Sequence, residues 1–102
     1  MKTPIITEFV KVTVPETTTE EQLTESADFL TAFLKEQDGF IDGELVKFTE
    51  GNTWCFIYRF ESMEKVKAIG GKMRAGRLFD RINALIVPGS MSVTFSQRLR
   101  QW

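Results

Sequence analysis

Residues 52–62 read NTWCFIYRFES, and this stretch decides the fold of the chain. Four of its side chains are aromatic and fall two residues apart, so in a β-strand they point to one face. This aromatic wall consists of Trp54, Phe56, Tyr58 and Phe60. Cys55 and Ile57 make the opposite face largely apolar as well. Both faces of the predicted strand therefore need cover.

The aromatic wall is either the floor of a packed core or one side of a small-molecule pocket. Large apolar stripes usually become core, and this interpretation is favoured. Ligand pockets, however, are also lined mostly by aromatic and apolar side chains with a few polar groups. Tyr58 carries a hydroxyl that needs a hydrogen-bond partner once it is buried. That partner is either a backbone carbonyl or a substrate, so the pocket interpretation stays open.

Length and composition bound the class of protein. The 102 residues, of which 42% are hydrophobic and 26% charged, fit one ordinary globular domain spanning residues 1–102. No apolar run approaches the roughly 18 residues that cross a bilayer, and the stretch from Met1 to Pro4 is too short for a secretory signal. A single cysteine cannot form an internal disulfide, so we expect a cytoplasmic protein with no membrane partner.

The absence of histidine restricts the chemistry. Zinc sites built on His and Cys, His general bases, the usual catalytic triads and His-ligated haem all need an imidazole. We therefore expect no metal site and no bound cofactor. Any catalysis has to use other side chains.

Charge is unevenly distributed along the chain. Residues 1–51 hold four lysines against eleven acids, whereas residues 52–102 hold nine basic residues against three acids. A nucleic-acid surface in the second half is one interpretation. The basic residues, however, recur around the outside of the predicted helices, which favours a solvated face. We therefore predict no nucleic-acid partner.

The remaining patterns predict elements on both sides of the aromatic strand. Alternating apolar residues indicate strands, and recurrence every three or four residues indicates helices. The predicted elements are a strand over 5–14, a helix from about residue 20 to 38–39, a strand over 40–49, a helix starting after residue 62, further helical spacing over 77–86, and a last, half-exposed strand over 90–96.

Turn and cap residues set the limits of these elements. Residues 17–19 are threonines that offer a capping hydroxyl to the first helix, and Ser62 is the predicted N-cap of the second. Gly70 and Gly71 each weaken a helix by about 1 kcal/mol relative to alanine, which predicts a kink or break there. The first helix has a buried stripe at helical spacing: Leu23, Ala27, Leu30 and Leu34.

The order strand, helix, strand, strand, helix, strand predicts an α+β protein with the ferredoxin-like split βαβ fold (βαββαβ). Right-handed crossovers place both helices on one face of a four-stranded antiparallel sheet. The other face is then bare, although the first and third strands are apolar on both sides. A second copy covers such a face most simply, so we predict a homodimer, sheet against sheet.

Two segments carry a resemblance to a known family. Residues 39–45, GFIDGEL, are similar to its glycine-phenylalanine entry into the second strand. Residues 57–62, IYRFES, are similar to its third strand running into an aromatic, any residue, serine junction. On these motifs the chain resembles the dimeric α+β barrel superfamily and, within it, the antibiotic biosynthesis monooxygenase-like family. The resemblance covers nearly the whole chain and implies the dimeric α+β barrel fold.

The resemblance also bears on the site. The family's oxygenases and haem-degrading members use a tryptophan at that junction, an asparagine on the first strand and, for haem, a histidine on the second helical segment. Here Phe60 occupies the tryptophan position, the first strand offers Thr7 and Glu8, and histidine is absent. The resemblance thus argues against haem degradation. It implies a pocket between the aromatic wall and the helices that holds a small aromatic or polyketide-like molecule.

Charged residues within apolar or helical patterns have two interpretations each. Glu8 and Arg59 are either a general base and an anion anchor or a structural ion pair at the dimer seam, and the second is favoured. Residues 70–77, GGKMRAGR, could cradle an anion through backbone amides and cations. They lack the spacing of a P-loop, so a helix break with solvated bases is favoured.

Two hypotheses of function follow. The first is a cofactor-independent monooxygenase acting on an aromatic or polyketide-like substrate, with Tyr58 or Glu8 as the catalytic proton acceptor. Its substrate-binding residues are those of the aromatic wall: Trp54, Phe56, Tyr58 and Phe60. The alternative is a non-catalytic dimer with a ligand-binding or structural role, suggested by the missing asparagine and histidine.

Overall fold

The computed structural model describes residues 4–102, so most of the N-terminal stretch considered above as a signal lies outside the described residues. Its elements are β1 (Ile6–Thr13), α1 (Glu20–Lys35), β2 (Phe40–Lys47), β3 (Thr53–Phe60), α2 (Met63–Ala75), α3 (Asp80–Asn83) and β4 (Ser92–Gln97). This order matches the prediction, and α3 lies within the predicted helical stretch over 77–86. Within residues 4–102, no helix combines the length and the apolar character needed to cross a membrane.

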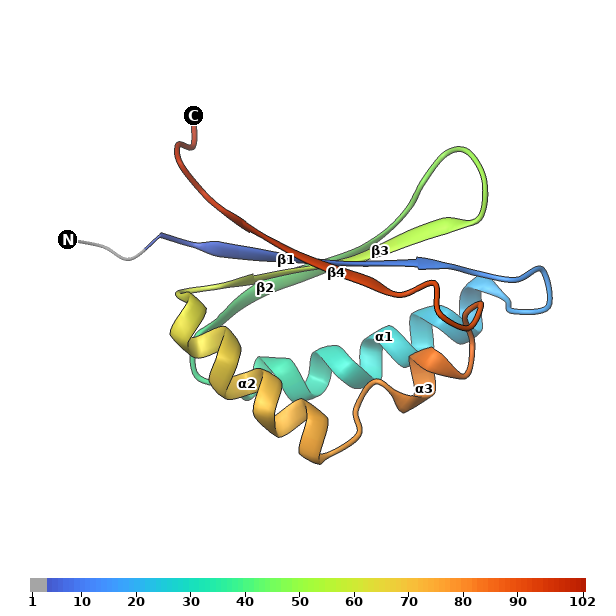
Figure 1. The fold of residues 1–102 in the computed structure, drawn as a ribbon, viewed down its shortest axis with the longest axis horizontal. Helices are drawn as coiled ribbons and strands as arrows, with labels where there is room; N and C mark the ends of the chain where they lie inside the picture. The colour runs from blue at the N-terminus through green and yellow to red at the C-terminus, as the bar shows by residue number, and fades with distance from the viewer. Residues whose placement is uncertain (1–3) are drawn as a thin grey trace.

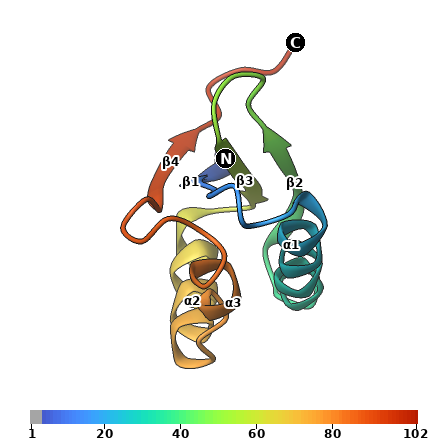
Figure 2. The same ribbon diagram turned by 90° about the vertical axis from the view of Figure 1, so that its right-hand side faces the viewer.

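The four strands form one antiparallel sheet in the order β2-β3-β1-β4. All three helices lie on the same side of this sheet (Figure 1). Seen end-on, α1 lies on the β2 side, whereas α2 and α3 lie on the β4 side (Figure 2). The predicted α+β class, with helices on one face of a four-stranded antiparallel sheet, is therefore confirmed.

The core lies between the sheet and the helices. The whole aromatic wall of β3 faces the helices and is buried, with exposed fractions between 1% and 6%. Antiparallel pairing places Val10 of β1 beside Phe56, and Val12 beside Trp54. The stripe that the sequence predicts on α1 is buried against them: Leu23, Ala27, Leu30 and Leu34. Burial of each such large side chain contributes about 1.5–3 kcal/mol, so this layer holds the fold together.

The start of α1 is fixed by local hydrogen bonds. The Gln22 backbone N–H donates to the Thr19 hydroxyl at 3.1 Å, and the Thr19 backbone N–H donates to the Gln22 side-chain oxygen at 2.8 Å. This reciprocal capping box satisfies two backbone donors that the helix would otherwise leave unpaired. At the other end, Gly39 adopts a φ of 95°, which leads the chain into β2.

Of the kink or break predicted at Gly70 and Gly71, the break is wrong, because both residues lie inside the continuous helix α2. The Ser62 hydroxyl caps this helix by accepting from the Lys65 backbone N–H at 3.2 Å. Side chains on both sides of the glycine pair are buried in the core: Val66, Ile69 and Met73. Their burial outweighs the roughly 1 kcal/mol that each glycine costs.

The chain instead leaves the helix at Gly76 and Arg77, where Arg77 has a positive φ of 53°. The predicted helical stretch over 77–86 is therefore shorter than expected and reduces to α3, although Ile82 is buried as its spacing indicated. A non-glycine residue in the left-handed region is uncommon and marks a true end of the helix.

Replacing Gly71 with alanine is expected to stabilise the protein by about 0.5–1 kcal/mol, because the backbone is already helical there. A β-carbon at Gly71 meets no atom within 4 Å. The matched control is Gly43→Ala in β2, where a β-carbon would lie 2.6 Å from the Tyr58 ring. Urea denaturation should show a higher midpoint for Gly71→Ala and a lower one for Gly43→Ala. A loss of stability in Gly71→Ala would contradict the continuous helix.

The outer face of the sheet has no helix over it among residues 4–102. It mixes apolar and charged side chains rather than being uniformly apolar. Phe9 and Ile57 are neighbours in the central strands and are partly buried. Beside them, the Arg59 guanidinium lies 2.8 Å from the Asp42 carboxylate and 3.6 Å from that of Glu44. The outer face is thus apolar at its centre, as predicted, and charged toward β2.

Candidate functional site

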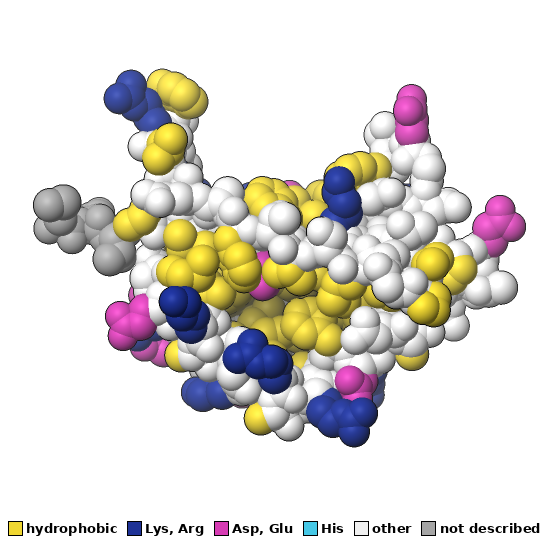
Figure 3. Space-filling model, in the orientation of Figure 1, with side chains coloured by type: hydrophobic (Ala, Val, Ile, Leu, Met, Phe, Trp, Pro, Cys, Tyr) yellow, Lys and Arg dark blue, Asp and Glu magenta, His cyan; other side chains and the backbone are white. Residues whose placement is uncertain are grey.

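A cavity of about 440 Å³ opens between α2 and β4 on the helix side of the sheet. Figure 3 shows it as a hydrophobic hollow in the face of the molecule, with an acidic group among the apolar side chains. Its volume lies in the range of small-molecule pockets. The lining residues are Glu8, Phe60, Met63, Val66, Lys67, Ile69, Gly70, Met73, Arg74, Phe79, Val93 and Phe95.

The cavity exists because the helices do not cover β4 completely. Val93 and Phe95 pair with Val10 and Glu8 of β1 and so point to the helix side. They remain 45% and 43% exposed, since α2 packs against β3 rather than over β4. The predicted last strand is present as β4, but all six of its residues are exposed, so the prediction that one of its faces is buried is wrong. Its apolar residues Val93 and Phe95 form one side of the cavity.

Among residues 4–102, Glu8 is the only acid that lines this cavity. It lies on β1 between Tyr58 of β3 and Phe95 of β4, on the core side of the sheet. Within residues 4–102, its carboxylate has no hydrogen bond or ion pair. Burial among apolar side chains raises the pKa of Glu8 from 4.5 to about 7. The cavity therefore holds a carboxylate that gains and loses a proton near neutral pH.

The structure divides the predicted site residues among three places. Phe60 lines the large cavity together with Glu8. Phe56 and Tyr58 line a smaller hollow of about 220 Å³ between α1 and β2. Trp54 lines neither of the two and packs in the core, with the Lys47 ammonium 5.3 Å from its ring centroid. The aromatic wall is thus mainly part of the hydrophobic core. The large cavity borders it at Phe60, and the smaller hollow borders it at Phe56 and Tyr58.

Several cavity residues were not predicted from the sequence. The sequence pattern contained a signal for Val93 and Phe95, because their alternation with polar residues placed them on one face of a strand. No sequence pattern indicated Met73 and Phe79 as cavity residues, since their position in the cavity depends on the continuous α2 and on the turn that follows it.

Tyr58 occupies its position because β2 carries a glycine opposite it. Gly43 pairs with Tyr58, and a β-carbon there would lie 2.6 Å from the Tyr58 ring. The Tyr58 hydroxyl is buried and makes no hydrogen bond among the described residues. Burial raises the pKa of Tyr58, the Glu8 charge raises it further, and the nearby Thr31 hydroxyl offsets part of the rise. Tyr58 is therefore a neutral phenol at physiological pH and a poor proton acceptor.

Tyr58→Phe is expected to stabilise the protein by about 1–2 kcal/mol, because a buried hydroxyl without a partner costs more than the carbon surface that replaces it. Chemical denaturation at neutral pH measures this change. A loss of stability would mean that the hydroxyl is hydrogen-bonded in solution, and Thr31→Val would then lower the stability as well.

Glu8 and Arg59 do not form the predicted ion pair. Arg59 is paired in register with Thr7 and points to the outer face, whereas Glu8 faces the helices. Arg59 lies on the same face as its register partner Thr7. Glu8 follows Thr7 in β1 and points to the other face, because side chains alternate along a strand. The Asp42 carboxylate accepts a hydrogen bond from Arg59 at 2.8 Å and raises the pKa of its guanidinium. Arg59 is therefore a structural residue of the outer face.

Residues suited to a metal ion do not cluster in the part of the chain that the structure describes. No group of three or more His, Cys, Asp or Glu side chains comes together within residues 4–102. The polar groups that the large cavity offers to a ligand are those of Glu8, Lys67 and Arg74.

Solved structures with the same fold were found, although no family model and no curated protein matches the sequence. SnoaB from Streptomyces nogalater, a cofactor-independent oxygenase, has 15% sequence identity and a TM-score of 0.78, with 97% of this chain and 96% of SnoaB covered. A candidate antibiotic biosynthesis monooxygenase from Bordetella bronchiseptica has 10% identity and a TM-score of 0.80, with 95% and 99% covered. A conserved protein of unknown function from Bacteroides thetaiotaomicron has 21% identity and a TM-score of 0.75, with 93% and 98% covered. The resemblance to antibiotic biosynthesis monooxygenase-like proteins is thus confirmed in the fold.

Proposed function

We propose that this protein is a cofactor-independent monooxygenase that acts on an aromatic or polyketide-like substrate bound in the cavity between α2 and β4. The observation that carries the proposal is Glu8, a carboxylate whose pKa is raised to about 7 inside an apolar cavity. A general base works best when its pKa lies near the working pH. The shared fold with SnoaB, described as a cofactor-independent oxygenase, supports the same class of reaction.

The proposed reaction converts a methylene group that is acidified by a neighbouring ketone and aromatic rings. The Glu8 carboxylate takes one proton, and the electron pair of the C–H bond remains on the substrate as a delocalised carbanion. This carbanion adds to O₂ and forms a C–O bond, giving a peroxide that takes up the proton from Glu8. Loss of the second C–H proton breaks the O–O bond and leaves a carbonyl. One methylene and one O₂ thus give one carbonyl and one water.

The cavity contributes orientation and exclusion of water. Phe60 of β3 and Phe95 of β4 line the cavity from the two strands that flank Glu8 of β1, so an aromatic substrate held there lies within reach of the carboxylate. The apolar lining also keeps the carbanion away from water, which would otherwise return its proton. Trp54 and Tyr58 have no direct part in this proposal, since neither lines the cavity.

Oxygen consumption with an anthrone-type substrate tests the proposal. The purified protein, without added cofactor, is expected to consume one O₂ for each quinone formed, measured with an oxygen electrode and by absorbance. Uptake that does not exceed the uncatalysed rate would refute the oxygenase. If the same compounds then raised the melting temperature without being converted, the non-catalytic ligand-binding alternative would stand instead.

The proposed assembly is a homodimer formed through the outer face of the sheet. Phe9 and Ile57 lie at the centre of this face and are not covered by any helix within residues 4–102. The free thiol of Cys55 fits a reducing compartment, and we propose the cytoplasm as the place of action.

A further inference from the structure

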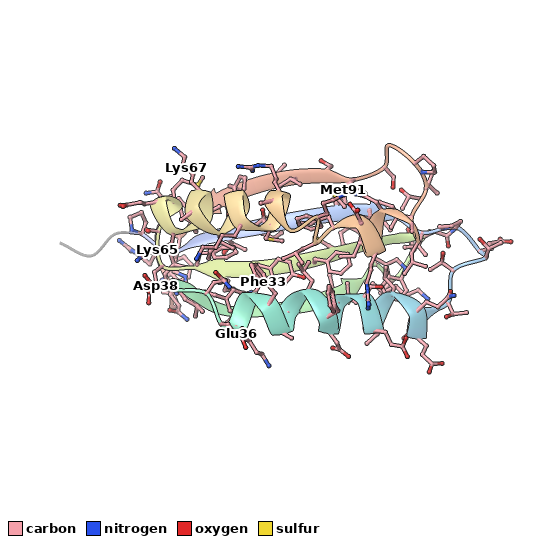
Figure 4. The ribbon with its side chains drawn as sticks, turned by 90° about the horizontal axis from the view of Figure 1, so that it is seen from below. Phe33, Glu36, Asp38, Lys65, Lys67 and Met91 are labelled. Atoms are coloured by element: carbon pink, nitrogen blue, oxygen red, sulfur yellow. The ribbon has the colours of Figure 1, made fainter. Side chains whose placement is uncertain are left out.

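One stripe of α2 borders the cavity and combines two cations with a glycine. Lys67, Gly70 and Arg74 are spaced three and four residues apart, so they lie on the same face of the helix. All three line the cavity. In Figure 4, Lys67 projects from α2 on the side away from α1, whereas Lys65 lies on the α1 side near Asp38. We call Lys67, Gly70 and Arg74 the basic lip.

Both cations of the basic lip lack a partner among the described residues. Other basic side chains of the molecule are engaged: Lys47 with Glu20, Arg59 with Asp42 and Glu44, Lys65 with Asp38, Arg77 with Asp80, and Lys72 with Gln37. Within residues 4–102, neither Lys67 nor Arg74 has an ion pair or a hydrogen bond. These two charges are therefore available to a ligand.

Gly70 leaves the space between the two cations open. It lies between them on the stripe, and because it has no side chain, no side chain of its own stands between the cations at the border of the cavity. The Arg74 guanidinium lies over it, with Nη1 3.4 Å from the position of a β-carbon at Gly70. Lys67 and Arg74 start about 10 Å apart along the helix axis, at 1.5 Å per residue. An anionic group at Gly70 would lie within reach of both side chains.

We propose that the substrate carries an anionic group, of carboxylate or sulfonate type, that binds at the basic lip while its aromatic body occupies the cavity. This inference rests on the proposed function, which places the reacting carbon at Glu8. The inference itself concerns the binding of the substrate alone. The negative charge of Glu8 deeper in the cavity excludes the anion from the interior, and the two cations attract it at the border. The substrate therefore binds in one direction, with its acidic C–H inside and its anion outside.

A matched pair of fluorescent probes tests the basic lip. The anionic probe is 1-anilinonaphthalene-8-sulfonate, and the neutral one is N-phenyl-1-naphthylamine, which has the same rings without the sulfonate. Titrations at low salt are expected to give tighter binding of the anionic probe. Lys67→Gln and Arg74→Gln are each expected to weaken the binding of the anionic probe by roughly twofold to fivefold, as for partly exposed charge pairs, and to leave the binding of the neutral probe unchanged.

Two control variants identify the place of binding. Lys72→Gln removes one charge from the same helix at a residue that binds Gln37, and neither probe should respond. Gly70→Leu places a side chain across the lip, and both probes should bind more weakly. Equal effects of the charge variants on both probes, unchanged binding in Gly70→Leu, or no binding of either probe would overturn the proposal. Oxygen uptake by the unmodified protein is a separate result, so the oxygenase and the basic lip can fail independently.

Discussion

Glu8→Gln is expected to abolish oxygen uptake, with a fall of at least about 100-fold in kcat. Glutamine has nearly the shape of glutamate but accepts no proton at neutral pH. Because no other acid in the described part of the chain lines the cavity, no neighbouring carboxylate there can replace Glu8. Tyr58→Phe should retain most of the activity, since Tyr58 lines a different hollow and not the cavity. Steady-state oxygen consumption with an anthrone-type substrate compares the two variants.

The same residue predicts the pH dependence of the reaction. Only the ionised Glu8 carboxylate can take a proton from the substrate, and its pKa is about 7. The activity should therefore rise from pH 6 to pH 8 with a midpoint near that value, and level off above it. A flat profile over this interval would exclude Glu8 as the base.

Glu8 also links the chemistry to the stability of the fold. The pKa of Glu8 is raised on folding from 4.5 to about 7, so the folded protein favours the protonated form. The free energy of unfolding is unaffected by this group below pH 4.5 and falls as the pH rises from there through 7, by about 3 kcal/mol in all. Glutamine carries no charge to bury, so Glu8→Gln is expected to be more stable than the unmodified protein at pH 8 and nearly equal at pH 4.

This opposition between activity and stability separates a catalytic base from a structural acid. If Glu8 were part of a structural ion pair, Glu8→Gln would lower the stability at pH 8 instead of raising it. Glu25→Gln on the exposed face of α1 is the matched control and should change neither property. A variant that keeps its activity would refute the assigned base, whatever its stability.

The sequence was informative where local patterns and tertiary packing agree. The alternation of Trp54, Phe56, Tyr58 and Phe60 could only be satisfied by a strand with a covered face, and the structure buries all four. Gly70 and Gly71 show the opposite case, because their helix propensity favoured a break. The burial of Val66 and Met73 on either side kept the helix continuous, and this tertiary contribution is not visible locally.

The candidate site depends even more on packing between distant elements. The sequence singled out Glu8 but could not tell whether it faces Arg59 or the helices, because the face of an isolated charge depends on strand register. It also placed Tyr58 and Phe60 in one pocket, since they share a face of β3. The helices divide that face, so Phe60 borders the large cavity and Tyr58 the small hollow.

Ile57→Lys is expected to convert the proposed homodimer into a monomer. Ile57 lies at the centre of the outer face beside Phe9, and a symmetric sheet-to-sheet contact would bring two copies of each substitution together. The two new ammonium groups would lie in the apolar centre of the contact, where removing a charged group from water costs several kcal/mol per ion. The Glu44 carboxylate, which is in register with residue 57, is already paired with Arg59. The dimer dissociation constant should rise more than about 100-fold.

Sedimentation at micromolar concentration measures this change. The unmodified protein is expected at about twice the chain mass of 11.7 kDa and Ile57→Lys at the single-chain mass. Thr24→Lys on the exposed surface of α1 adds the same charge on the helix side of the molecule and should leave the dimer intact. An unmodified protein that sediments as a single chain at these concentrations would refute the homodimer.

The Ile57→Lys monomer also tests whether assembly and chemistry are independent. The cavity lies on the helix side of the sheet, whereas Ile57 and Phe9 lie on the outer face, so the two surfaces are separated by the thickness of the sheet. A lysine at position 57 can extend its ammonium into solvent from a partly buried stem, which leaves the core in place. The monomer is therefore expected to keep the binding of both naphthalene probes within about twofold, the scale of a surface change outside the site. A monomer that folds but loses both probes would mean that the second copy completes the cavity.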